Sequence, residues 1–354
     1  MPASLRSDAE ARRKVDNLYK HRLNDNSSDK YKGPWQKFTK WLDSIGISRY
    51  LDVSIVTDQV IIFYLGHIVA DAKNRGVGKQ VIDTTLAAIR YFYLSAGLES
   101  PTESPIVTSL RLAVPRILIG KRSSCVPLTA EQLLTVLQFH LTSSCTLRVR
   151  MHLTIYLLMF VGLFRFSDVQ KILVHDELLQ KRYDKQGNLI GLLIFIPWSK
   201  TDQSHDGAWV AIGATRGAYC PVGLVLSLLR KGKYTTRPSS TEFVGPLLRA
   251  TARHNPNALR QTSSSLDNPI QPLTYQAMLH SIQPMVKEAI GVHTALHGPR
   301  KGGASTAAQE GIESQLICAL GRWKFGNTFE DTYLTMLDGN ARKYFDLTRK
   351  IWPY

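Results

Sequence analysis

His297 and Arg300 lie three residues apart and could bind one anion together. Residues at this spacing share one face of a helix, so both side chains can converge on one anion. Lys301 follows at once, and Gly302 and Gly303 leave room for a phosphate group or a nucleic-acid backbone to come close. The same pattern is also typical of a solvated basic helix turn. Its meaning therefore depends on partners elsewhere in the chain.

Further candidates lie on both sides of this motif. Arg165 directly follows the most apolar segment of the chain. It either points into a site or forms a surface pair with Asp168, three residues later. Lys200 lies in a segment of turn composition, and Trp323 and Tyr333 follow the His-x-x-Arg pair. Taken singly, these three residues are typical of a solvated turn, a core or capping aromatic, and an amphipathic helix.

The N-terminal part of the chain predicts a small helical domain. Residues 1–30 are polar, and their end has the composition of a mobile segment. Apolar residues recur at helical spacing over 31–97, with Thr57 as a start signal and Gly97 as a stop signal. The predicted organisation is a polar segment at 1–30, a helical domain at 31–120 and a basic linker at 121–127.

The segment 128–354 predicts a second domain that combines helices with a small antiparallel sheet. A capping-box pattern opens it at Thr129, and the apolar run 149–164 is typical of a buried helix. Branched apolar runs predict two strands joined by a hairpin that carries Lys200 in its turn. The remaining elements are predicted as strands at 190–198 and 208–212, helices at 222–229, 274–290 and on either side of Gly311, a loop at 253–268, and a tail helix at 341–354.

The composition is that of a folded, basic protein. Its 44 Lys and Arg against 28 Asp and Glu give a net charge of +16, while 44% of its residues are hydrophobic and 20% charged. A hydrophobic fraction of this size excludes a disordered chain. The positive charge favours polyanionic partners, with nucleic acid first and an acidic membrane second.

Metal, disulfide and membrane signals are weak. The cysteines lie far apart and lack the spacing of a zinc site or a disulfide framework, so buried free thiols are expected. No carboxylate cluster suits a two-metal site, and no cofactor is predicted. The charged N-terminus lacks an apolar signal segment, and the longest apolar run, 155–164, is too short to span a membrane. The prediction is a soluble intracellular protein, nuclear if its source is eukaryotic. The cysteines are Cys125, Cys145, Cys220 and Cys318.

The candidates stand in an order that resembles the active-site series of tyrosine recombinases. That family uses Arg, Lys, His-x-x-Arg, His or Trp, and a nucleophilic Tyr, and the resemblance covers roughly residues 125–354. The sequence around His297 and Trp323 is most similar to that of the Crypton and DIRS-like recombinases of eukaryotic mobile elements. The resemblance implies a helical core-binding domain and an α+β catalytic domain that form a C-shaped clamp on DNA. The matching residues are Arg165, Lys200, His297, Arg300, Trp323 and Tyr333.

The resemblance implies cleavage and rejoining of DNA strands through a 3′-phosphotyrosine intermediate, without metal or ATP. Tyr333 would be the nucleophile, and His297 would handle its proton. Arg165 and Arg300 would hold the phosphate oxygens. Lys200 would protonate the leaving oxygen, Trp323 would donate its indole N–H to the phosphate, and Asp168 matches the family's acidic residue after the first arginine.

Basic residues near the motifs are predicted to contact the DNA backbone. They are Lys301, Arg322, Lys324, Lys79, Arg90, Lys121 and Arg122. The spacing of ten residues from Trp323 to Tyr333 is about one longer than the family pattern, which leaves Tyr344 as a second candidate nucleophile.

Several alternatives remain open at this level. The partners implied are double-stranded DNA and further copies of the chain, as a dimer or as a tetramer on recombining DNA. A topoisomerase of type IB would use similar chemistry as a monomer, and a non-catalytic DNA-binding protein could keep the same fold. The tail at 341–354 either packs on its own domain or docks on a neighbouring protomer.

Overall fold

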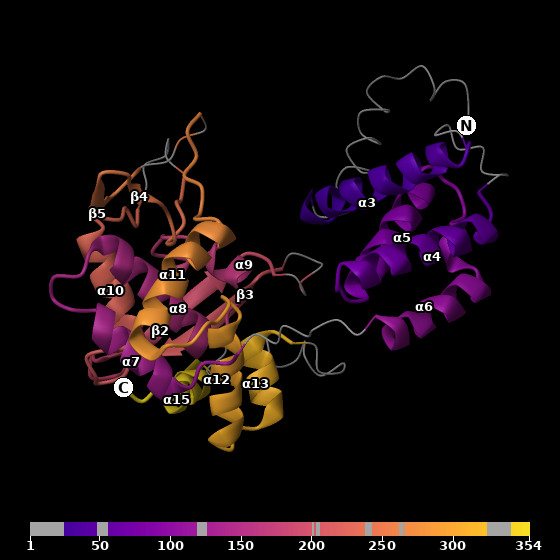
Figure 1. The fold of residues 1–354 in the computed structure, drawn as a ribbon. Helices are drawn as coiled ribbons and strands as arrows, with labels where there is room; N and C mark the ends of the chain where they lie inside the picture. The colour runs from indigo at the N-terminus through magenta and orange to yellow at the C-terminus, as the bar shows by residue number, and fades with distance from the viewer. Residues whose placement is uncertain are drawn as a thin grey trace, which may run out of the picture. The chain divides into compact units, whose positions relative to one another are not determined.

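The chain divides into two compact units, residues 1–124 and 125–354. The division lies inside the segment 121–127, which the composition marks as a linker. Figure 1 shows the helices and strands of both units. The computed structural model describes residues 25–47, 56–118, 126–199, 202, 206–237, 243–261, 265, 267–323 and 341–354.

Unit 1 is built from helices around a core of aromatic and branched side chains. Phe38, Ile61, Ile82 and Tyr93 come from three different helices, and all are fully buried. The prediction of a helical domain is confirmed, including the helix start at Thr57. The elements are α3 (Asp25–Ser44), α4 (Asp58–Asn74), α5 (Gln80–Ser95), the 3-10 turn η1 (Pro101–Glu103) and α6 (Pro105–Ile117).

The prediction of a mobile end to the polar segment is wrong for Asp25–Asp29, which form the first turns of α3. Asp, Asn and Ser are favoured both in loops and at helix starts, since their side chains can satisfy free backbone N–H groups. Composition alone therefore cannot separate the two. Residues 1–24 lie outside the described residues.

Unit 2 is organised around one buried helix, α8. Its residues from Met151 to Val161 are all buried, which is the behaviour of a helix that is apolar on every side. Helices α10, α11 and α12 pack against it, and the capping box at Thr129 is present at the start of α7. The helices are α7 (Ala130–His140), α8 (Leu147–Val161), α9 (Phe166–Val169), α10 (Pro221–Lys231), α11 (Tyr275–Ile290), α12 (Gly298–Gln309), α13 (Ser314–Gly321) and α15 (Ala341–Ile351).

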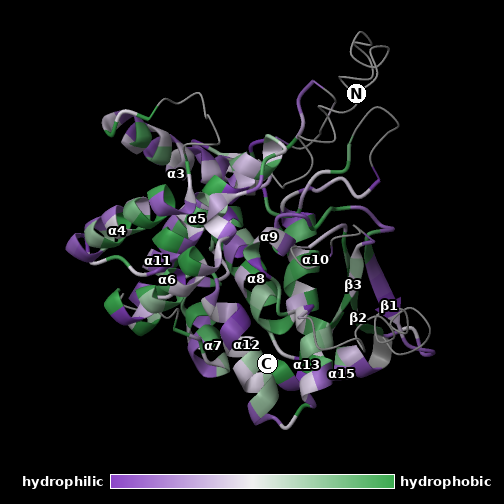
Figure 2. Cartoon of the chain, turned by 90° about the vertical axis from the view of Figure 1, so that its right-hand side faces the viewer, coloured by the Kyte–Doolittle hydropathy of each residue, from purple (hydrophilic) through white to green (hydrophobic). Residues whose placement is uncertain are grey.

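A three-stranded antiparallel sheet in the order β1-β2-β3 accompanies these helices. β2 (Leu189–Ile196) and β3 (Ala208–Gly213) confirm the predicted hairpin, with Phe195 opposite Trp209. The outer strand β1 (Leu179–Tyr183) was not predicted. Figure 2 shows why, because β1 is largely hydrophilic whereas β2 and β3 are largely hydrophobic.

The loop predicted at 253–268 is partly wrong. A second antiparallel pair, β4 (Thr251–Ala252) and β5 (Asn255–Leu259), forms a short hairpin there. Its strands contain few branched residues and little alternation, so the sequence carries no strand signal.

The fold class predicted from sequence, mainly helical with a small antiparallel sheet, is confirmed. Within the described residues, no helix combines the length and apolar character needed to cross a bilayer.

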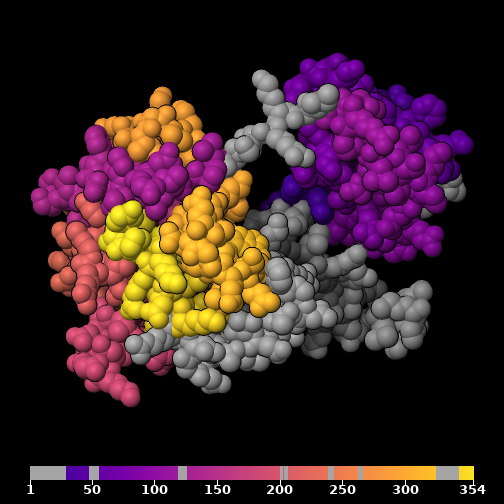
Figure 3. Space-filling view, turned by 90° about the horizontal axis from the view of Figure 1, so that it is seen from below, coloured from indigo at the N-terminus to yellow at the C-terminus, as the bar shows by residue number. Residues whose placement is uncertain are grey.

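The terminal helix α15 packs on its own unit. Thr348 Oγ1 accepts a hydrogen bond from the Gly213 backbone N–H at 2.7 Å, and the Arg349 guanidinium donates to the carbonyls of Ala214 and Ile190. In Figure 3 the yellow terminal segment lies against the orange helices that include α12, with which α15 is in contact. In the structure of the single chain, the tail therefore packs on its own domain, which is the first of the two alternatives considered from the sequence.

Trp352 anchors this helix, since its side chain is fully buried and its indole N–H donates to the Tyr219 carbonyl at 3.0 Å. We expect Trp352→Ala to lower the free energy of unfolding of unit 2 by about 3–5 kcal/mol, because it leaves a large cavity. Denaturant titration followed by circular dichroism measures this change. The exposed neighbour Lys350 provides the control, and Lys350→Ala should change stability by less than about 0.5 kcal/mol. Equal, small effects would mean that α15 does not stabilise its own unit.

Candidate active site

The loop that follows α8 forms the floor of the candidate site. α8 ends at Val161, and Leu163 adopts a left-handed conformation with φ of 47°. For a residue with a Cβ this conformation costs roughly 1–2 kcal/mol, so other contacts must hold it. The Leu163 carbonyl accepts hydrogen bonds from the guanidinium groups of Arg300 and Arg322. These two bonds fix the turn that leads into Arg165.

Arg300 lies in the first turn of α12 and is 1% exposed. Its terminal nitrogens donate to the carbonyls of Leu163 and Gly321, the latter at 2.5 Å. The ring of Trp323 covers the guanidinium at 4.3 Å from its centroid. Arg300 and Trp323 are thus brought together as the sequence order predicts. The arginine fork, however, faces backbone carbonyls rather than solvent.

His297 lies directly before α12, one turn from Arg300. Desolvation is the largest influence that lowers the pKa of its imidazole, followed by the positive charges of Arg300, Lys301 and Arg165. Arg165 belongs to a different segment, so its contribution reflects proximity in the fold. The structure therefore gathers Arg165, His297 and Arg300 in one electropositive region. A neutral imidazole there can accept a proton.

Asp168 connects the two sides of this region. One carboxylate oxygen accepts a hydrogen bond from the Arg165 backbone N–H at 2.9 Å, and the same oxygen is 2.8 Å from an Arg322 nitrogen. This pair is almost completely buried, with side chains 0% and 2% exposed. The Arg165–Asp168 surface pair considered from sequence is absent from these contacts. Instead, Asp168 holds the backbone of Arg165 and the side chain of Arg322.

The prediction that Arg322 contacts the DNA backbone is contradicted by this burial. Arg322 ends α13 in a left-handed conformation with φ of 54°, which turns its side chain under the ring of Phe164. The sequence shows a basic residue between glycine and tryptophan but not the inward turn. Lys301 is exposed, as its prediction requires.

The function predicted for Gly302 and Gly303 is also wrong. Both are buried in the contact between α12 and α8 rather than exposed to a ligand. A Cβ at Gly302 would lie 1.8 Å from the Leu128 carbonyl oxygen, and one at Gly303 would lie 2.0 Å from that of Phe160. Close helix packing, not the approach of DNA, requires these glycines.

Lys171 is a candidate that the sequence did not single out. Its ammonium donates to the Trp198 carbonyl at 2.9 Å and lies 4.5 Å from the centre of that ring. Partial burial lowers its pKa, while Asp168 and Asp202 oppose the shift. The residue precedes the predicted strands, so only tertiary structure brings it to the base of the hairpin that carries Lys200.

The remaining predicted residues have different outcomes. Lys200, Tyr333, Lys324, Lys121 and Arg122 lie outside the described residues. Tyr344, the second candidate nucleophile, is 2% exposed in α15, and burial raises the pKa of its hydroxyl. Both features disfavour it as a nucleophile in this conformation.

Two predicted DNA contacts, Lys79 and Arg90, lie in unit 1 at α5. Both are exposed, and Arg90 pairs with Glu103 at 2.8 Å. The described residues contain no cluster of His, Cys, Asp and Glu that could hold a metal ion. In the same part of the chain Cys145, Cys220 and Cys318 are free thiols, but they are half-buried rather than buried as expected.

Comparison with known proteins relates this fold to DNA integrases. No family model and no curated protein sequence matches the chain. Two structures of a variant Tn1549 transposon integrase with circular intermediate DNA are similar, each with a TM-score of 0.51, at 12% and 10% identity. The match covers 90% of this chain and 93% and 94% of the integrase chains.

A FLP recombinase–Holliday junction complex also matches, at 18% identity and a TM-score of 0.36, over 56% of this chain. The chain spans only 43% of that FLP chain. At these identities the likeness concerns the fold alone. The chain shares its fold with the Tn1549 transposon integrase, whose match extends over both units.

The electrostatic proximity of Arg165 to His297 can be tested by titration. Since the pKa of His297 is lowered in the folded state, the unfolded chain binds a proton first as pH falls below 6.5, and the folded state loses stability there. We expect Arg165→Gln to raise the pKa of His297, measured by NMR of its imidazole. The control Arg182→Gln removes an exposed charge on β1 and should leave it unchanged. An unaltered pKa in Arg165→Gln would show that the two residues are not close.

The buried Asp168–Arg322 pair gives a second prediction. Arg322→Met should lower the free energy of unfolding by roughly 3–5 kcal/mol, because it leaves a buried carboxylate without its counter-charge. Urea titration measures the change, and the double variant Asp168→Leu/Arg322→Met should lose less. Breaking the exposed Arg90–Glu103 pair with Arg90→Met should cost at most about 1 kcal/mol. Similar costs for the two pairs would contradict the burial of the first.

Proposed function

We propose that this protein cleaves and rejoins DNA strands through a covalent 3′-phosphotyrosine intermediate. The observation that carries the proposal is the convergence of Arg165, His297 and Arg300 beside the loop after α8, with Trp323 stacked on Arg300. This cluster lies on a fold similar to that of an integrase solved with DNA. The identity of these residues and their order in the chain match the recombinase pattern.

The two arginines would supply the charge that the reaction needs. Negative charge develops on the non-bridging oxygens during attack on a phosphodiester, and a guanidinium can hold two such oxygens at once. Arg300 must exchange its carbonyl partners for the phosphate, so DNA binding would rearrange the contacts to Leu163 and Gly321. Arg165 lies at the start of α9, where Asp168 already fixes its backbone. Preorganised charge of this kind does the electrostatic work without a metal ion.

Proton transfer would be divided among three types of residue. His297, whose lowered pKa favours the neutral imidazole, would take the proton of the Tyr333 hydroxyl as that oxygen attacks phosphorus. A lysine would protonate the leaving 5′-oxygen, with Lys200 as the first candidate. Lys171 is the second candidate, because it lies at the base of the same hairpin and has a lowered pKa. The phosphotyrosyl bond keeps the energy of the phosphodiester, so rejoining needs no ATP.

Basic residues around the site would position the duplex. Lys301 is exposed beside His297, and Lys79 and Arg90 are exposed on the helical unit. We assign Lys324, Lys121 and Arg122 to the same role from sequence. The net charge of +16 would draw DNA to the protein at low salt.

The biological role we propose is integration or excision of a mobile element. The Tn1549 integrase, whose fold this chain shares, is a transposon protein solved with circular intermediate DNA. The sequence around His297 and Trp323 favours an enzyme of the Crypton or DIRS-like type. We further propose that copies of the chain assemble on recombining DNA, which requires the contacts of α15 to be rearranged if that helix joins neighbours.

Adduct formation tests this function. A library of nicked duplexes of random sequence would trap the cleaved strand, and adducts would be selected after denaturation in the presence of a chelator. We expect adducts with the native protein and none with Tyr333→Phe, because only the phenolic oxygen can form the bond. Sequencing the captured DNA would identify the site.

Tyr344→Phe is the matched control, since it removes one hydroxyl from a buried tyrosine and should leave adducts intact. Adducts that survive in Tyr333→Phe but vanish in Tyr344→Phe would overturn the nucleophile assignment. Their absence with the native protein on every duplex would favour a non-catalytic DNA-binding protein.

A further inference from the structure

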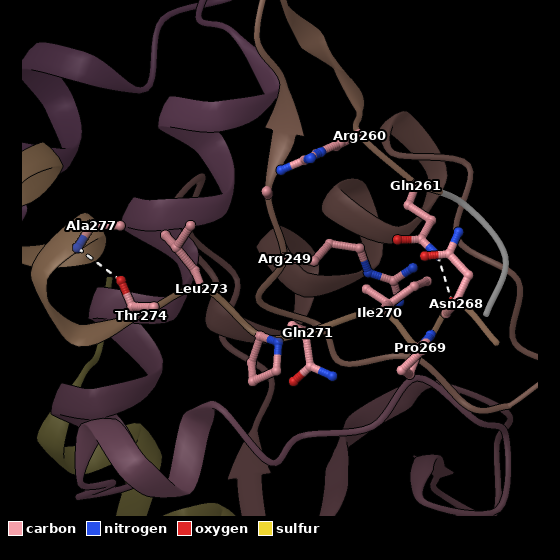
Figure 4. Close-up of a pocket in the computed structure, with 12 residues that line it drawn as sticks. Arg249, Arg260, Gln261, Asn268, Pro269, Ile270, Gln271, Leu273, Thr274 and Ala277 are labelled. Atoms are coloured by element: carbon pink, nitrogen blue, oxygen red, sulfur yellow. Dashed lines mark hydrogen bonds between the residues drawn. The ribbon is translucent and has the colours of Figure 1, made fainter. Parts of the chain in front are cut away.

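A pocket of about 570 Å³ lies between the β4–β5 hairpin and the start of α11. Its lining includes Arg249, Arg260, Gln261, Asn268 and Thr274, which Figure 4 shows as sticks. None of these residues belongs to the candidate active site.

Arg249 is a buried cation in this pocket, only 3% exposed. Its Nε donates to the Pro246 carbonyl at 2.7 Å, and its guanidinium lies over the Tyr234 ring at 4.5 Å. A Cβ at Gly245 would lie 2.7 Å from one of its terminal nitrogens, so the glycine leaves room for the group in this position. The guanidinium is therefore held in place by three neighbours. In Figure 4 it points toward the side of the pocket formed by Gln261 and Asn268.

The two terminal nitrogens of Arg249 donate no hydrogen bond to any of the described residues. Arg249 also forms no ion pair with a carboxylate in the part of the chain that the structure describes. A buried guanidinium without a counter-charge is costly, and burial accordingly lowers the pKa of this group. Its paired N–H groups remain available to a ligand with two oxygens.

The rest of the lining favours an anion. Arg260 adds a second positive charge, and no Asp or Glu occurs among the described residues that line the pocket. The first turn of α11 also borders it, since Thr274 and Ala277 belong to the lining. The dipole of this helix start attracts negative charge, while the Ala277 N–H itself donates to Thr274 Oγ1 at 3.3 Å.

Size and polarity indicate more than a bare ion, because the volume exceeds what a phosphate group alone fills. The amides of Asn268 and Gln271 offer both donors and acceptors, and Gln261 keeps its amide oxygen while its Nε2 donates to the Asn268 carbonyl at 2.7 Å. Amide groups of this kind pair with the edges of bases. A nucleotide combines the required anion with such an edge.

We infer that this pocket binds a nucleotide, with its phosphate group on the terminal nitrogens of Arg249 and its base toward the neighbouring amides. The nucleotide is either part of a DNA strand or free in solution. The DNA source rests on the function proposed above, whereas the free source does not.

Calorimetric titration with thymidine 5′-monophosphate, thymidine and a short duplex tests the pocket. The native protein should bind the monophosphate but not thymidine. Arg249→Gln should weaken binding by about tenfold to a hundredfold, the usual value of a charge-assisted hydrogen bond. If the phosphate belongs to DNA, the same variant should also reduce the salt dependence of duplex binding by about one phosphate contact.

Arg253→Gln is the matched control, because it removes an exposed arginine from the turn of the same hairpin and outside the pocket lining. It should not change monophosphate binding. A loss with the monophosphate but not with the duplex identifies a free nucleotide, and a loss that includes the duplex identifies the strand. No loss with either ligand in Arg249→Gln overturns the inference.

Two further measurements keep the result clear. If Arg249→Gln does not fold, monophosphate binding is measured with Arg260→Gln instead. This variant removes the second positive charge of the pocket, which is exposed at the surface, and should weaken binding. Monophosphate binding should persist in Tyr333→Phe, whereas adduct formation should vanish in the same variant. Failure of the pocket and failure of the strand-cleavage function therefore give different results.

Discussion

Burial of two arginines beside one backbone carbonyl is the constraint on which the candidate site depends. Arg300 and Arg322 both donate to the carbonyl of Leu163, and Arg322 also pairs with the fully buried Asp168. Removing a guanidinium from water is costly unless its donors are satisfied and its charge is balanced. These contacts hold Leu163 in a left-handed conformation and so define the direction in which the chain enters Arg165.

The same network joins segments that are distant in sequence. The loop after α8, the start of α12 and the end of α13 meet at these hydrogen bonds, and Gly302 and Gly303 allow α12 to lie close enough to α8. Charge therefore serves two purposes here. Arg322 and Asp168 stabilise the site, while Arg165 and His297 remain near its surface, where they can meet a ligand. Arg300 stands between these groups, since it is buried in this conformation and needed for the proposed reaction.

A second buried arginine environment occurs at the β4–β5 hairpin. Arg249 resembles Arg322 in its burial and its contact with an aromatic ring. Arg322 has a carboxylate partner, whereas Arg249 has none among the residues that the structure describes. Because of this difference, Arg322 stabilises the interior of the protein, whereas Arg249 is suited to bind an external anion. Both environments arise on a scaffold dominated by α8, which buries its whole circumference.

Local patterns were sufficient to predict the mainly helical class, the hairpin of β2 and β3, and the order of the candidate site residues, because apolar periodicity and residue type are local properties. They did not determine that Arg322 turns inward, that Gly302 and Gly303 serve packing, or that Lys171 lies at the hairpin base. These outcomes depend on which surfaces meet, since a glycine or an arginine has the same local signal whether it faces a ligand or another helix. The buried position of Tyr344 was likewise decided only when α15 packed against the sheet.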